Sequence, residues 1–311
     1  MSTTKNGEFS VGTKIKKDLK RNRGVYLMLL PVVVYYIAFH YAPMYGAQIA
    51  FRDFEPVKGL WGSTWIGLEN FKTFFDSYYF GRLIRNTVLL SAYDIIFGFP
   101  APIILALMLN EVHHTPFKKF IQTVSYLPHF ISTVVICGMI LNFTAKNGLI
   151  NQILMMFGGQ SIPFMSLPQY FRPTYITSNV WQSIGWNSII YLAAISNIDQ
   201  QLYEAARIDG AGRFRQVLSV TLPSILPMIV ILLILRLGNI MTMGAEKILL
   251  LYNASTYETA DVISTFVYRK GMLEGNYSYS TAVGLFNSVI NFTVLVLVNK
   301  ISKKVSSSSL W

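Results

Sequence analysis

The chain has 311 residues, of which 52% are hydrophobic and only 13% are charged. A soluble domain carries about 25% charged residues, so this composition excludes an ordinary soluble protein and indicates a polytopic membrane protein. The formal net charge is +11, but the positive residues concentrate beside apolar runs, so we expect no nucleic-acid partner. The single cysteine, Cys137, excludes an internal disulfide.

Basic residues crowd the N-terminal segment directly before the first apolar run. Positive charge beside a span marks its cytoplasmic side, and no small-residue cleavage site follows the run, as one would in a secretory signal. We therefore expect a retained first helix with the N-terminus in the cytoplasm. The basic residues are Lys5, Lys14, Lys16, Lys17, Lys20, Arg21 and Arg23.

Six apolar runs are long enough to cross a bilayer, which takes about 20 mainly apolar residues. Six spans return the C-terminus to the cytoplasm, and the cytoplasmic segments are then denser in Lys and Arg than the outside segments. The sequence predicts an all-α, multi-pass protein of the cell (cytoplasmic or inner) membrane, in contact with lipid. The expected spans are residues 25–46, 83–109, 121–143, 174–198, 223–243 and 279–299.

Composition divides the chain into four parts. The first part is a basic cytoplasmic segment (1–24), and the second contains the first span and an aromatic-rich outside segment (25–82). A core (83–300) and a short cytoplasmic tail (301–311) follow. Aromatic rings favour the membrane–water boundary, so residues 47–82 are interpreted as an interfacial elbow helix in preference to a ligand contact. The other long outside segment, 244–278, carries Asp261, Lys247 and further charges. It is either a contact for an extracellular partner or a solvated loop.

A charged, glycine-bent segment at 204–227 lies between two strongly apolar runs, on the expected cytoplasmic side. Glu204, Ala205 and Ala206 favour a short helix, and Gly210 and Gly212 permit a sharp turn after it. The pattern predicts two short helices with a bend that expose their charged side chains for insertion into a partner. A generic connection with capping charges is the alternative. The exposed charges are Glu204, Arg207, Asp209, Arg213 and Arg215.

This segment resembles the EAA motif of permease subunits from ATP-binding-cassette (ABC) importers, and further motifs resemble the sugar-importing branch of that family. The resemblance covers roughly residues 25–300, and within the family the chain is similar to the LplB-type polysaccharide permeases. One departure is Val217, where an aromatic residue is frequent. The further motifs are Ile66–Phe71, Asn86–Thr87, Leu127–Pro128 with Ile131–Ser132, Gly148–Asn151 and Ile198–Asp199.

The resemblance implies a type I ABC importer permease fold, similar to that of maltose permeases. It also implies that the chain forms the pathway for an oligosaccharide or polysaccharide. It implies a second permease subunit in a heterodimer, two ATPase subunits that bind ATP and Mg²⁺, and an extracytoplasmic solute-binding protein. The chain itself then binds no cofactor or metal and is a transport subunit, not an enzyme. Residues expected to couple to the ATPase lie within the loop at 204–223: Glu204, Ala205, Ala206, Arg207, Asp209, Gly210 and Arg213.

Two charged residues lie inside the expected spans, where a charge is costly and indicates function. They are Asp94 in span two and Arg236 in span five. Arg236, Asn239 and Met243 recur at i, i+3 and i+7, which would place them on one helical face. Two interpretations stay open: this face lines a substrate cavity, or Arg236 pairs with Asp94 and only holds the helices together.

Polar and aromatic residues in spans four and six are further candidates for the substrate pathway. Trp186 and Asn187, with Trp181 and Gln182, suit the faces and hydroxyl groups of sugars, although packing is the favoured interpretation. Asn287 and Asn291 share a face and favour hydrogen bonds between helices. His113 and His114 lie in a short inside loop, and no metal site is expected there.

The sequence contains no Gly-x-x-x-x-Gly-Lys-Ser/Thr motif, so nucleotide would be handled by another subunit. It also lacks the His-Glu-x-x-His and Gly-x-Ser-x-Gly signatures of membrane metalloproteases and hydrolases. A secondary transporter is disfavoured because no repeated half is detectable. A permease for a non-sugar solute remains an alternative.

Overall fold

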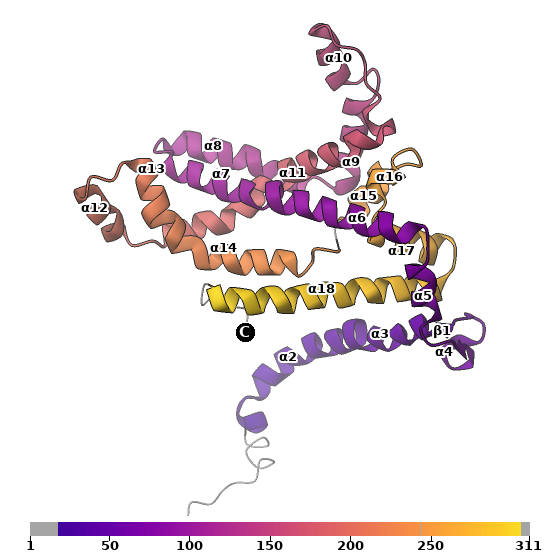
Figure 1. Ribbon diagram of the computed structural model, residues 1–311. Helices are drawn as coiled ribbons and strands as arrows, with labels where there is room; N and C mark the ends of the chain where they lie inside the picture. Colours follow the sequence, from indigo (N-terminus) through magenta and orange to yellow (C-terminus); the bar gives the residue numbers. More distant parts are fainter. Residues whose placement is uncertain (1–17, 243, 306–311) are drawn as a thin grey trace, which may run out of the picture.

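The computed structural model describes residues 18–242 and 244–305, and within them the chain is almost entirely helical (Figure 1). The exception is one antiparallel pair of two-residue strands, β1 (Arg52–Asp53) and β2 (Thr64–Trp65). Five described helices are long and apolar enough to cross a membrane, which confirms a multi-pass helical membrane protein. Most of the basic segment 1–24 and of the tail 301–311 lies outside the described residues.

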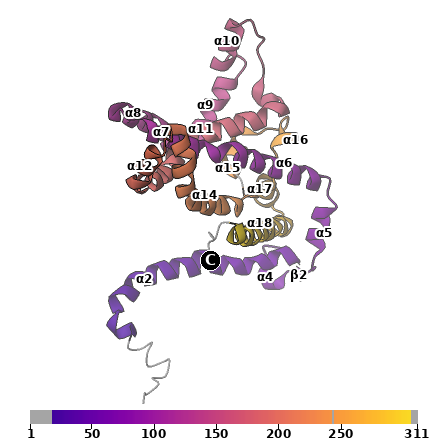
Figure 2. The same cartoon turned by 60° about the vertical axis from the view of Figure 1, so that its left-hand side comes forward.

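The first candidate span, Arg23–Phe51, extends away from the rest of the chain. None of the α2 residues is buried, and Figures 1 and 2 show α2 as an arm beyond α18. Only the end of the span packs closely, where η2 contacts α18. The span consists of α2 (Arg23–Tyr36), η1 (Ile37–Tyr41), α3 (Ala42–Met44) and η2 (Tyr45–Phe51).

A compact outer segment, including α4 (Gly59–Gly62) and α5 (Glu69–Phe75), follows the first span. Gly67 has a φ of +64°, which glycine adopts at little cost, and it turns the chain from β2 into α5. The Asn70 side chain then donates to the carbonyl of Ala50 at 2.9 Å. The turn at Gly67 and the hydrogen bond of Asn70 give the Ile66–Phe71 motif a structural role, because they hold the end of the first span in place.

The second candidate span, Tyr79–Glu111, contains a π-helical turn in its middle. It comprises α6 (Tyr79–Tyr93), the π-helical turn η3 (Asp94–Gly98) and α7 (Pro100–Glu111). Pro100, which begins α7, has no backbone N–H to donate, so the regular helical hydrogen bonding changes at this point.

The expected third span, residues 121–143, is wrong as a single helix. The structure has α8 (Thr115–Tyr126), a short 3-10 turn η4 (Leu127–Phe130) and a new helix α9 (Thr133–Thr144). Ser132 has extended backbone angles and accepts a hydrogen bond from the N–H of Val135. Because a serine in this conformation caps a helix start, it separates α9 from α8. After α9 come α10 (Leu149–Met156) and η5 (Phe164–Ser166).

The central helix is α11 (Pro168–Ser196), with 29 residues and a length of roughly 43 Å. It covers the fourth expected run, although it is less apolar than the five candidate spans and is not among them. It packs along α7 and crosses α8 so closely that a Cβ on Gly185 would lie 2.1 Å from the carbonyl oxygen of Ser125. The packing of α8 therefore depends on glycine at position 185.

A bent connection links α11 to the fifth candidate span, Arg213–Leu237. The elements are α12 (Gln200–Ile208), α13 (Arg213–Gln216), η6 (Val217–Thr221) and α14 (Leu222–Leu237). The expected end at residue 243 is wrong, because α14 stops at Leu237 and hydrogen-bonded turns follow. Figure 1 shows α12 and α5 at opposite ends of the helical bundle.

Short helices fill the stretch between α14 and the last span, and α18 closes the bundle. Tyr279 and Val283 of α18 join Phe74 and Phe266 in a buried apolar cluster that fixes this end of the helix. The elements are α15 (Ala245–Leu251), α16 (Tyr257–Ala260), α17 (Ile263–Tyr268), η7 (Arg269–Leu273) and α18 (Tyr277–Val305).

Candidate functional site: the coupling loop, the intramembrane ion pair and two cavities

The loop at 204–223 forms the two short helices that the sequence predicts. Asp199 caps α12 by accepting from the N–H of Gln201 at 2.9 Å. Gly210 ends the helix with a φ of +76°. The N–H of Gly210 donates to Arg207 O, and the N–H of Ala211 donates to Ala206 O. This pair of bonds with a left-handed glycine is the Schellman helix ending, and it sets the angle between α12 and α13.

The outer surface of this loop is open. All its charged side chains are exposed, and none forms an ion pair with another described residue. Ile208 and Phe214 are also 86% and 77% exposed. Large apolar side chains exposed beside unpaired charges are typical of docking surfaces.

The inner side of the loop is fastened to the bundle. The Tyr203 hydroxyl of α12 hydrogen-bonds to the Thr221 hydroxyl at 2.9 Å, and Thr221 is buried at the start of α14. The hydrogen bond therefore joins α12 to the residue directly before α14, the helix that bears Arg236.

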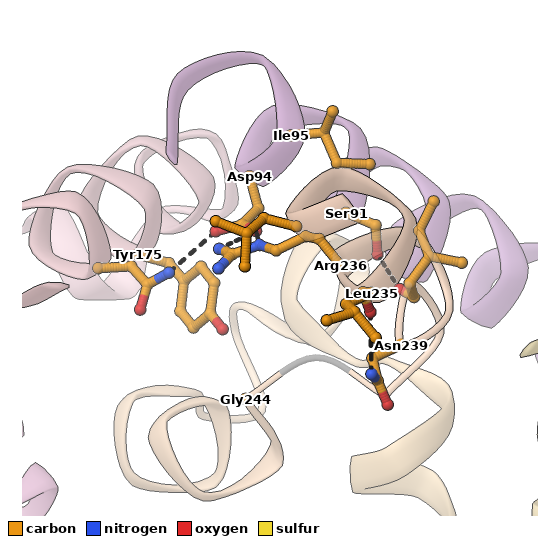
Figure 3. Close-up of a pocket in the computed structure, with 11 residues that line it drawn as sticks. Ser91, Asp94, Ile95, Tyr175, Leu235, Arg236, Asn239 and Gly244 are labelled. Carbon is orange, nitrogen blue, oxygen red and sulfur yellow. Dashed lines mark hydrogen bonds and ion pairs between the residues drawn. The ribbon is translucent and has the colours of Figure 1, made fainter. Parts of the chain in front are cut away.

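Asp94 and Arg236 form an ion pair between η3 and α14 (Figure 3). Arg236 donates from both Nε, at 2.8 Å, and Nη2 to Asp94 Oδ2, while Asn179 of α11 donates to Oδ1 at 3.0 Å. Asp94 is 3% exposed, whereas one third of the Arg236 side chain is exposed. A Cβ on Gly98 would collide with Asp94 Oδ1 at 2.8 Å. The pair thus requires glycine four residues after the aspartate.

Arg236 also lines two cavities, so it both pairs with Asp94 and borders open volume, and the use of that volume by a substrate stays a prediction. One cavity of about 440 Å³ is lined by Asp94, Tyr175, Asn179, Arg236 and Asn239, among others. A second of about 270 Å³ is lined by Trp186, Asn187 and Arg236, among others. Arg236 and Leu232 line both cavities.

The expected helical face of Arg236, Asn239 and Met243 is wrong, because α14 ends before Asn239. Asn239 still lines the first cavity, since its N–H donates to Arg236 O in the turn that follows the helix. Met243 lies outside the described residues.

Asn287 lies apart from both cavities and holds the backbone beyond α14. Its Nδ2 donates to Met241 O at 3.2 Å, and Asn291 Oδ1 accepts from the N–H of Met241 at 2.9 Å. This arrangement agrees with the expected hydrogen bonding between helices.

His114 caps α8 by accepting from the N–H of Phe117. The described residues contain no group of three or more side chains suited to a metal ion.

Trp186 faces the second cavity from α11. Its ring stacks on His129 of η4 with centroids 4.5 Å apart and planes at 4°. His129 is therefore the stacking partner of Trp186, and no motif in the sequence pointed to it. Trp181 lines a different, apolar depression together with Phe143 and Phe164.

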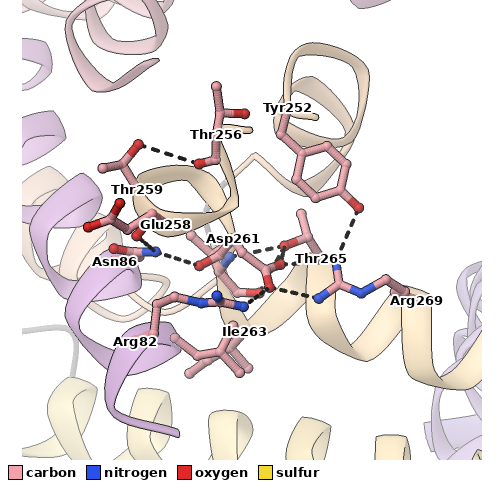
Figure 4. A network of polar contacts seen from close by, with 12 residues as sticks. Arg82, Asn86, Tyr252, Thr256, Glu258, Thr259, Asp261, Ile263, Thr265 and Arg269 are labelled. Atoms are coloured by element: carbon pink, nitrogen blue, oxygen red, sulfur yellow. Dashed lines mark hydrogen bonds and ion pairs between the residues drawn. The ribbon is translucent and has the colours of Figure 1, made fainter. Parts of the chain in front are cut away.

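Asp261 is the centre of a buried polar cluster that sequence reasoning missed (Figure 4). It is fully buried and pairs with Arg269 through both carboxylate oxygens, at 2.7 and 3.2 Å, and with Arg82 at 3.4 Å. Asn86 donates to the carbonyls of Glu258 and Asp261 at 2.9 and 3.0 Å. Burial acts to lower the pKa of Arg269, but the hydrogen bond and charge of Asp261 raise it above its ordinary value. The interpretation of this segment as a solvated loop is wrong at Asp261.

Replacing Asp261 by asparagine is expected to destabilise the protein by about 3 kcal/mol, because it leaves two arginines without their counter-charge. Thermal unfolding of the purified protein in detergent measures the effect. The control is Glu274→Gln, which removes an exposed pair with Lys270 and should cost less than about 1 kcal/mol. Equal melting temperatures for the two variants would contradict this role of Asp261.

Lys247 of α15 is a second charged residue that the solvated-loop interpretation expected to be exposed and that is buried instead. It is 4% exposed, and its Nζ lies 3.4 Å from Gln182 Oε1 and 5.8 Å from the ring centroid of Tyr175. Burial lowers its pKa to about 8. Among residues 18–242 and 244–305, no carboxylate forms an ion pair with Lys247.

A bundle of membrane-crossing helices, cavities beside a buried ion pair and an exposed loop fastened to the bundle are features of membrane transport subunits. The family model described as binding-protein-dependent transport system inner membrane component matches residues 98–307. The chain belongs to this family. It is therefore a permease-type transport subunit with the type I ABC importer permease fold.

Two relatives from Bacillus subtilis match nearly the whole chain. Protein LplB is 45% identical over 294 residues, which cover 94% of this chain and 92% of LplB. The polygalacturonan/rhamnogalacturonan transport system permease protein YteP is 44% identical with the same coverage. A chain in the crystal structure of a bacterial alginate ABC transporter, in complex with an alginate pentasaccharide-bound periplasmic protein, is 43% identical. It has a TM-score of 0.88 over 94% of this chain and 99% of that chain.

Proposed function

We propose that this chain is one of two permease subunits of an importer that takes up an oligosaccharide or polysaccharide. The names of its relatives support a carbohydrate, since they cover polygalacturonan, rhamnogalacturonan and alginate. An extracytoplasmic binding protein delivers the cargo, as the periplasmic protein in the alginate complex suggests. The second permease is a different chain, in a heterodimer.

ATP and Mg²⁺ are bound by two separate ATPase subunits, one of which holds the loop at 204–223. The observation that carries this proposal is the exposed two-helix loop fastened through Tyr203 to Thr221. The exposed residues of this loop are Glu204, Ala205, Arg207, Asp209 and Arg213. The half-buried Ala206 and the turn at Gly210 set its shape. Closure of the ATPases moves α12, and the hydrogen bond transmits that movement to α14.

The protein spans the cytoplasmic membrane six times, with α11 as the span beyond the five apolar candidates. The start of α2, the end of α18 and α12 lie toward one end of the bundle (Figure 1), which supports both termini on the cytoplasmic side. The core of the permease is residues 83–300. The basic segment and the tail lie in the cytoplasm.

The cargo passes the two cavities that Arg236 lines. Arg236, Asn239 and Asn187 offer hydrogen-bond donors and acceptors for hydroxyl groups, and Trp186 offers a ring face for a sugar. Asp94 fixes Arg236 in place, and Asn287 supports the turn that carries Asn239. Met243 remains a candidate by its position in the sequence alone.

Co-purification tests the partners. A tagged form of this chain, expressed with its candidate partner subunits, is expected to elute as an assembly that contains an ATPase and a second permease. The variant Ile208→Asp/Phe214→Asp places charge on the apolar part of the docking surface and should lose the ATPase but keep the second permease. A chain that elutes alone and transports cargo without ATP would contradict the proposal.

A further inference from the structure

The charge balance around the first cavity rests on Lys247 and not on Arg236. Asp94 neutralises Arg236 through two hydrogen bonds, so that pair contributes dipoles and donors but no net charge. Lys247 has no such partner among the described residues. One uncompensated cation is therefore buried in this part of the bundle.

Lys247 lies directly behind the cavity wall. Tyr175 and Gly244 both line the cavity, and the Lys247 ammonium lies 5.8 Å from the centroid of the Tyr175 ring. Gln182 accepts from the ammonium and holds it against α11. Tyr175 therefore belongs both to the cavity wall and to the surroundings of the charge.

A buried ammonium without a counter-charge is costly. A cation–π contact and one amide oxygen offset part of this cost. A carboxylate in the adjoining cavity would offset more, because Coulomb interactions are strong where water is excluded. A neutral sugar in the same place would leave the charge uncompensated.

We propose that Lys247 is a specificity-determining residue that selects saccharides carrying carboxylate groups in the cavity bounded by Tyr175, Asn179 and Arg236. This inference rests on the proposed function as a carbohydrate importer, and it adds the residue that recognises acid groups on the cargo. Arg236 and Asn239 then serve the hydroxyl groups, while Lys247 supplies the electrostatic attraction for the acid.

The test uses the complete importer in proteoliposomes, with trigalacturonate loaded on its binding protein. Lys247→Met is expected to lower trigalacturonate uptake about 10-fold, while subunit assembly and basal ATP hydrolysis stay within about twofold of the parent. Lys247→Arg, which keeps the charge, should retain uptake within about threefold. The matched control is Lys270→Met, which removes a partly buried lysine that pairs with Glu274 and should leave uptake unchanged.

Wild-type uptake by Lys247→Met, or equal loss in the methionine and arginine variants with assembly intact, would overturn the role of the Lys247 charge. If the parent importer takes up maltotriose but not trigalacturonate, the carbohydrate function stands and this inference fails. If an assembled importer takes up neither saccharide, the proposed carbohydrate function fails as well.

Discussion

Gly210→Val is expected to abolish ATP-driven transport while the membrane-embedded bundle stays folded. Gly210 has a φ of +76°, and a β-branched residue in this region costs about 1–3 kcal/mol. The strain is purely conformational, because no atom lies within 4 Å of a Cβ at this position. The end of α12 should therefore rearrange, and the docking surface should lose its shape. ATP hydrolysis stimulated by the loaded binding protein, together with cargo uptake, measures the result.

A neighbouring glycine supplies the control for this prediction. Gly212 is equally open, but its φ of −66° is accessible to any residue, so Gly212→Ala should transport normally. Gly210→Asn should fall between the two, because asparagine tolerates the left-handed region better than valine does. Full activity of Gly210→Val would show that the angle between α12 and α13 does not matter for coupling.

Asp94→Ala is expected to destabilise the protein by about 3 kcal/mol, at the lower end of the cost of breaking a buried ion pair. The estimate is at the lower end because one third of the Arg236 side chain is exposed and water can reach the unpaired guanidinium. The variant also frees Asn179, which donates to the same carboxylate. Thermal unfolding without cargo measures the loss.

A second substitution separates the two functions of Arg236. Asp94→Leu/Arg236→Met removes both charges and should regain most of the stability, because neither member of the pair is then left buried without its partner. The same double variant should still transport poorly, since the cavities have lost their main donor. Glu55→Gln, which removes an exposed pair with Lys58, is the control and should change stability by less than about 1 kcal/mol. A double variant that transports normally would reduce Arg236 to a residue that holds helices together.

Local features of the sequence predicted the coupling loop well. The bend after α12 depends on one glycine and on short-range hydrogen bonds, so residues 204–212 contain nearly all the information that determines it. The break between α8 and α9 depends on equally local signals, Pro128 and the capping Ser132. Hydropathy alone obscured that break, because apolar residues continue on both sides of it.

The buried charges could not be predicted in the same way. Asp261 and Lys247 lie in a stretch whose composition resembles a solvated loop, and their burial comes from contacts with α6 and α11. Arg82 is 179 residues from Asp261 along the chain, and Gln182 is 65 residues from Lys247. A single sequence does not encode such pairings visibly. The sequence did offer the Asp94–Arg236 pair as one of two interpretations of Arg236, because a charged residue inside an apolar run is easily recognised.

ATP-dependent uptake of a labelled saccharide into proteoliposomes tests most directly whether this chain forms the pathway of an importer that obtains its energy through the loop at 204–223. The vesicles contain this chain, its partner permease and the ATPase, and the binding protein is added outside. We expect uptake that requires both enclosed ATP and the binding protein, and that is lost with Gly210→Val. Uptake driven by an ion gradient in vesicles without ATP would contradict this function.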